Sequence, residues 1–140
     1  MFDKKYEERL AAWHNFRNTL ETAEDPLQEV IDYYGRAPMV SINTDPYNQD
    51  TWLDPWELVL ENQYCDFCRV LGQCYSLQLT ERFSEVDFEI HISIDPEKSE
   101  SYYLLHVGDK VLGYRNCYVS IEDIPQSVVS QKVYHMPKLQ

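Results

Sequence analysis

The fold is decided by two stretches with different hydrophobic periods, DPWELVLENQYCDFCRVLG (54–72) and FEIHISI (88–94). In the first stretch, apolar residues recur every three or four positions, which is the period of an amphipathic helix. In the second, apolar and polar residues alternate, which is the period of a strand with one buried face. The chain therefore changes from helices to strands near its middle.

The start of the predicted helix is well marked. Asp54-Pro55-Trp56-Glu57 combines an Asp-x-x-Glu capping box with a proline at the first helical position. We expect this helix to run to Gly72. In an alternative that stays open, Asn62-Gln63 breaks it and leaves Cys65 near a second helix N-terminus.

The second half of the chain predicts an antiparallel meander of strands. A period of two first appears at Tyr75, Leu77 and Leu79, and after residues 88–94 it continues through 102–107, 111–114 and 117–121. Gly108-Asp109 stands between two apolar runs and indicates a tight hairpin.

The first half predicts two more helices, over residues 3–22 and 26–34, from the spacing of their apolar residues. Residues 36–52 are rich in Pro, Asn and Asp, with Val40 and Ile42 alternating, and should be mostly loop. Residues 130–140 surround Met136-Pro137 and should form a tail, frayed or bound to a partner.

These elements predict an α+β fold. We expect N-terminal helices to pack on one face of a C-terminal antiparallel sheet of four to five strands. At 140 residues, 44% of them hydrophobic, residues 1–140 should form a single domain with its own core. The aromatic fraction of 14% is high, and aromatic residues favour interfaces, so a surface that meets a protein partner is expected.

The formal net charge is -12, which repels phosphate backbones and makes nucleic acid an unlikely partner. One alternative use of such acidity is inhibition of a host protein that itself binds nucleic acid. No run approaches the roughly 20 apolar residues of a membrane helix, and no signal-peptide core follows the N-terminus. We therefore expect an intracellular protein, no membrane contact, and free thiols at all four cysteines.

Cys65 near a possible helix start, followed by strands and by His91 on the second strand, resembles the core of the transglutaminase-like and papain-like cysteine hydrolases. The resemblance implies a hydrolase or acyltransferase with Cys65 as nucleophile and His91 as base. Residues 102–107 lack the acid that this family places after the histidine, so Asp109 is the remaining candidate. His91 also alternates with the apolar residues of its strand, which predicts that it faces away from the Cys65 helix.

Metal and cofactor sites are not expected. Cys65-x-x-Cys68 with Cys74 and His91 is half of a zinc signature, because a second pair of ligands is missing. The carboxylates around residues 81–97 lack calcium-loop spacing and are explained as solvated positions. No glycine-rich phosphate loop is present in the sequence.

The stretch from Trp52 to Ile94 resembles small uncharacterised proteins of tailed phages that infect marine cyanobacteria. Four segments carry the resemblance: Asp54–Leu58, Tyr64–Cys68, Leu77–Phe83 and Phe88–Ile92. It implies a viral protein in the host cytoplasm, also incorporated in the virion if it is structural. The leading hypothesis is a non-enzymatic phage accessory or virion-associated protein that acts through protein contacts, with the cysteine hydrolase and the acidic inhibitor as alternatives.

Overall fold

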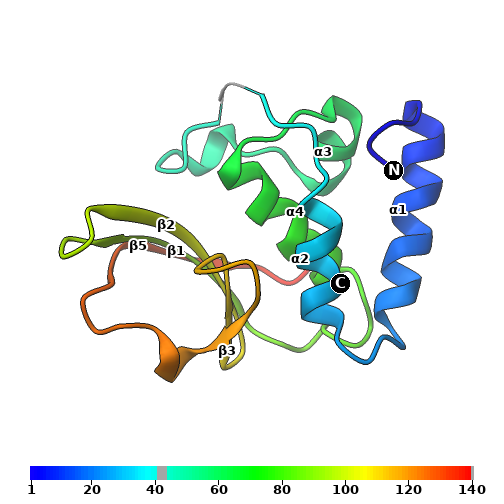
Figure 1. Ribbon diagram of the computed structural model, residues 1–140. Coiled ribbons are helices and arrows are strands. Elements are labelled where there is room, and N and C mark those ends of the chain that lie inside the picture. The colour runs from blue at the N-terminus through cyan, green and yellow to red at the C-terminus, as the bar shows by residue number, and fades with distance from the viewer. Residues whose placement is uncertain (41–43, 140) are drawn as a thin grey trace.

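The computed structural model describes residues 1–40 and 44–139 and confirms the α+β arrangement, with helices first and an antiparallel sheet second (Figure 1). Residues 41–43 of the expected loop, which include Ile42, and residue 140 of the expected tail lie outside the described residues. The α-helices are α1 (Tyr6–Leu20), α2 (Pro26–Tyr34), α3 (Pro55–Glu61) and α4 (Asp66–Gln78). None of the helices in the described ranges is long and apolar enough to cross a membrane.

The break predicted as an alternative within residues 54–72 is present. Asp54 and Glu57 form the expected capping box at the start of α3. Asn62 ends α3 in the left-handed conformation, with φ of 51°, which asparagine tolerates better than most residues. Cys65 then caps α4, the central helix of the fold.

The strand expected at Tyr75, Leu77 and Leu79 is wrong, because α4 continues through Gly72 as far as Gln78. Every residue of α4 from Val70 to Gln78 is buried. A helix that is buried on all sides has no polar face, so a short window of it can imitate the alternation of a strand.

The sheet has five antiparallel strands in the described residues, in the order β4-β3-β2-β1-β5. Their bounds are β1 (Phe88–Asp95), β2 (Glu100–Val107), β3 (Lys110–Leu112), β4 (Val119–Ser120) and β5 (Val129–Met136). The Gly108-Asp109 hairpin joins β2 to β3 as predicted. The 3-10 turns are η1 (Gln49–Thr51) and η2 (Ile121–Asp123), and the described part of 36–52 is otherwise loop apart from one bridge, Met39 to Tyr64.

The tail expected over 130–140 is instead largely strand β5, which pairs with β1 along the edge of the sheet. The sequence pattern does not indicate this strand, because Tyr134 is the one buried residue of β5 and the other residues face solvent in whole or in part. Exposed polar residues such as Lys132 are typical of edge strands, where they discourage pairing with other chains. The described end of the chain beyond Met136 is not in a strand.

The two faces of the sheet are covered differently. Phe88, Ile90 and Leu105 pack against the helices in the main core. Strands β4 and β5 lie at opposite edges, so the connection 121–128 must cross the sheet, and Figure 1 shows it on the side away from the helices. Leu104 and Val111 are buried on this second face.

Aromatic rings build much of the helical side of the core. Trp13, Tyr34, Tyr64 and Phe67 are among its largest fully buried side chains. The high aromatic content is therefore explained mainly by packing, although Trp56 remains 48% exposed. The expectation of a partner-facing surface stays a prediction, because packing alone accounts for most of the rings.

Candidate functional site

The predicted nucleophile Cys65 is a buried helix cap. Its Sγ accepts a hydrogen bond from the backbone N–H of Cys68 at 3.3 Å, and the Cys68 thiol donates to Thr44 Oγ1 at 3.3 Å. The hydrogen bond between the two thiols lowers the pKa of Cys68 and raises that of Cys65. Cys65, the residue that the hydrolase hypothesis requires as a thiolate, is therefore the weaker acid of this buried pair.

His91 and Asp109 do not join Cys65. Cys65 belongs to the core on the helical side, whereas His91 alternates with Phe88 and Ile90 and so points to the opposite face of β1. Asp109 is exposed in the turn after β2, whereas His91 pairs with Leu104, three residues or about 10 Å before the end of that strand at Val107. The structure brings no two of the three predicted catalytic residues together.

His91 instead belongs to a cluster with Glu89, His106 and His135. Its Nε2 lies 2.9 Å from Glu89 Oε1, and its ring stacks on that of His106 with 3.7 Å between centroids. Burial, and then the neighbouring His91, lower the pKa of His106 to about 4. The hydrogen bond from His91 lowers the pKa of Glu89. Within the described residues, Glu89, His91 and His106 of this cluster have the donor types and spacing to hold a metal ion.

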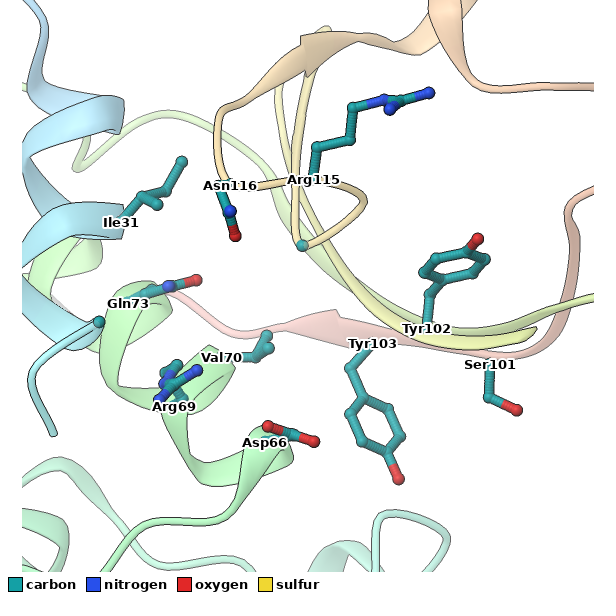
Figure 2. Close-up of a pocket in the computed structure, with 12 residues that line it drawn as sticks. Ile31, Asp66, Arg69, Val70, Gln73, Ser101, Tyr102, Tyr103, Arg115 and Asn116 are labelled. Carbon is teal, nitrogen blue, oxygen red and sulfur yellow. The ribbon is translucent and has the colours of Figure 1, made fainter. Parts of the chain in front are cut away.

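A separate pocket of about 280 Å³ opens between α4 and β2, and we call it the α4–β2 pocket (Figure 2). The end of α2 and the turn 113–116 complete its wall. Its polar lining includes Asp66, Arg69, Gln73, Tyr102, Arg115 and Asn116. Figure 2 shows Gln73 reaching into the opening from α4 and Asn116 reaching toward it from the turn.

Two side chains of α4 have unmet hydrogen-bonding capacity at this pocket. Arg69 Nε is buried without a hydrogen-bond partner among the described residues, and its guanidinium forms no ion pair with a described carboxylate. Gln73 is 6% exposed, and its Oε1 also lacks a partner there. Arg69 and Gln73 are four residues apart, so they share one face of the helix. The pocket thus presents an unpaired cation and an unpaired acceptor side by side.

The opposite wall is held in place by Gly113. Its φ is +103°, and a side chain there would run into the backbone of Tyr103. Glycine therefore permits the turn 113–116 to approach β2 closely and to place Asn116 at the pocket. Arg115, in contrast, points away from α4 in Figure 2 and lies over the ring of Tyr114.

Neither of these two sites was predicted from the sequence. For the pocket, the signal was the spacing of Arg69 and Gln73, two long polar residues at helical spacing within an otherwise apolar run. For the histidine cluster, the sequence carried no comparable signal. Glu89, His106 and His135 meet through strand register, and β5 was not recognised as a strand.

No model of a known protein family matches this sequence, and no curated protein matches it either.

Proposed function

We propose that this chain is a non-enzymatic phage accessory or virion-associated protein that holds a carboxylate of a protein partner in the α4–β2 pocket. The observation that carries the proposal is the unpaired guanidinium of Arg69. An unpaired charge with a buried nitrogen is costly. The chain has twice as many acidic as basic residues, so an acidic residue of the chain itself could have paired with Arg69. A ligand carboxylate supplies the missing anion.

The chemistry of the ligand follows from the second unpaired group. Gln73 Oε1 requires a hydrogen-bond donor, whereas Arg69 requires an anionic acceptor. An acidic residue or the C-terminal residue of a peptide carries both, because its carboxylate lies close to a backbone N–H. At about 280 Å³ the pocket is below the roughly 300–1,000 Å³ of most small-molecule sites, which favours one residue of a partner over a cofactor.

Two further observations support a binding role. Tyr103 lines the pocket together with Arg69, and tyrosine and arginine are among the residue types that contribute most to protein interfaces. The opposite placement of Cys65 and His91 argues against the hydrolase alternative. The phage setting rests on the resemblance of residues 52–94.

The binding step is tested by NMR titration of the folded chain with N-acetyl-glutamate and, as a neutral match in which both carboxylates are replaced by amides, N-acetyl-glutaminamide. We expect amide shifts around the pocket with the first probe and much weaker ones with the second. A charge-assisted hydrogen bond contributes about 1.5–3 kcal/mol, so Arg69→Met should weaken binding roughly 10- to 100-fold. Arg36→Met, which changes an exposed arginine beside Tyr33, should leave binding unchanged. Equal binding of both probes, or full binding by Arg69→Met, would overturn the proposal.

The biological role is tested during infection with a photo-crosslinking residue in place of Asn116, which is exposed and reaches toward the pocket. One viral or host protein should crosslink in high yield, and Arg69→Met should abolish the product. Detection at fixed stoichiometry in purified particles would indicate a virion protein, and its absence there an accessory protein of the infected cell. Failure to crosslink any partner would contradict both roles.

A further inference from the structure

Three of the chain's four histidines meet on the sheet face opposite the helices, and this arrangement is independent of the pocket. In the register of the sheet, Glu89 on β1 pairs with His106 on β2 and with His135 on β5. The three side chains therefore form one row across three strands. His91 stands two residues further along β1 and points to the same face.

The hydrogen bonds in this cluster converge on Glu89. Its Oε1 lies 2.9 Å from His91 Nε2, and its Oε2 lies 3.0 Å from His135 Nδ1. His106 stacks on His91, but among the described residues no hydrogen-bond partner is found for its ring nitrogens. A carboxylate and two imidazoles are thus gathered in a partly buried place, with His106 free to bind.

We propose that Glu89, His91 and His106 form a binding site for a divalent transition metal of the zinc class. One ligand atom from each residue lies within 4.8 Å of the other two. Imidazole nitrogen with a single carboxylate is a donor set suited to zinc and its first-row neighbours, whereas calcium and magnesium prefer oxygen donors alone. Metal–ligand bonds of about 2.0–2.2 Å need a closer approach of the three atoms. Binding therefore draws the side chains together and turns the two stacked rings.

Strand β5 supplies the outer contacts that such a site requires. Ser130 Oγ lies 2.7 Å from His91 Nδ1, which fixes the ring and directs Nε2 toward Glu89. His135 holds the other oxygen of Glu89. Contacts of this kind orient metal ligands and typically change metal affinity 10- to 100-fold. A metal site was not expected from the sequence, because the cysteines lack a second ligand pair and the carboxylates around residues 81–97 lack calcium-loop spacing. The site proposed here combines Glu89 with histidines of two strands.

The experiment uses the full chain without a histidine tag and titrates it with cobalt(II) alone, followed by competition with zinc. We expect one equivalent to bind, with visible ligand-field bands and no near-ultraviolet charge transfer from thiolate ligands. Glu89→Gln and His106→Ala should each weaken binding at least tenfold, and Ser130→Ala should weaken it about 10- to 100-fold. His14→Ala is the matched control: it removes the fourth histidine, exposed on α1 next to Asn18, and should leave binding unchanged.

Thermal unfolding of each variant, without metal, shows whether it is folded. Glu89→Gln keeps the shape of the side chain, and Ser130→Ala removes only a hydroxyl. These two variants therefore test the metal site even if His106→Ala fails to fold. Three results would overturn the proposal: no binding at stoichiometric concentrations, thiolate bands that place the metal on cysteines, or full binding by folded Glu89→Gln and Ser130→Ala.

Discussion

The ring of Tyr34 on α2 fills the space directly beside Gly72 on α4, so that a Cβ at position 72 would lie 2.8 Å from Tyr34 Cζ. The ring is held there by its hydroxyl, 2.9 Å from Ser76 Oγ. Trp13 Nε1 donates to the same oxygen at 2.9 Å. Three helices are therefore locked together at one buried polar contact.

Gly72→Ala should lower the free energy of unfolding by about 1–3 kcal/mol, as overpacking of a core typically does. Alanine favours a helix over glycine by about 1 kcal/mol, so a loss would show that the clash with Tyr34 outweighs propensity. Urea denaturation measures the free energy of unfolding of each variant. Gly35→Ala is the control, because Gly35 ends α2 with helical angles and its nearest obstacle, Asp32 O, is 3.2 Å away. If Gly72→Ala is as stable as Gly35→Ala, the close contact between Tyr34 and Gly72 would be contradicted.

The capping box of α3 should contribute measurably to stability. Asp54 Oδ1 accepts from Glu57 N at 2.8 Å, and Glu57 Oε1 accepts from Asp54 N at 3.0 Å. Asp54→Ala should cost about 1 kcal/mol in urea denaturation. Glu57→Gln keeps an acceptor at the same position and should cost less. The reverse order would show that the charge of Glu57, and not the box, stabilises the helix.

The reactivity of the thiols in the folded chain tests whether Cys65 is a buried helix cap or an accessible nucleophile. Cys117 is exposed, whereas Cys65, Cys68 and Cys74 are buried. A disulfide reagent should therefore modify one thiol rapidly in the folded chain and all four after denaturation, and Cys117→Ser should remove the rapid phase. Mass spectrometry that finds Cys65 modified in the folded chain would contradict its assignment as a buried cap.

High pH should unfold the protein through its buried tyrosines. Burial raises the pKa of Tyr33 to about 12, and burial also raises the pKa of Tyr34 and Tyr64. In the unfolded chain tyrosine ionises near about 10, so this contribution to stability is complete below pH 10 and is lost as the pH rises toward 12. Tyrosinate absorbance and far-ultraviolet circular dichroism should then change together. Ionisation of all 11 tyrosines without loss of helix would contradict this prediction.

Local signals account for the parts of the fold that were predictable. The start of α3 is encoded by Asp54 and Pro55 within four residues, and the β2–β3 hairpin by Gly108-Asp109. The end of α4 was not predictable, since packing against Tyr34 lets the helix continue through Gly72. Strand β5 was missed because an edge strand buries too little apolar surface to alternate clearly.

For the sites, too, only features encoded by residues close together in the sequence were predictable. Alternation along β1 predicted that His91 faces away from Cys65, and the structure agrees. The neighbours that His91 has instead depend on pairing across three strands, which is a long-range property. The α4–β2 pocket likewise depends on the approach of the turn 113–116, which lies more than 40 positions after Arg69 in the sequence.

If Arg69 receives a carboxylate from a partner, the Nε–Hε resonance of its guanidinium should report the binding directly. In a titration with N-acetyl-glutamate, the resonance of Arg69 should shift downfield and exchange more slowly with water, because its buried and unpaired Nε–H gains an acceptor. Arg36 should not respond. An Arg69 resonance that stays unchanged while the probe binds elsewhere, or that responds equally to the neutral N-acetyl-glutaminamide, would contradict this role of Arg69.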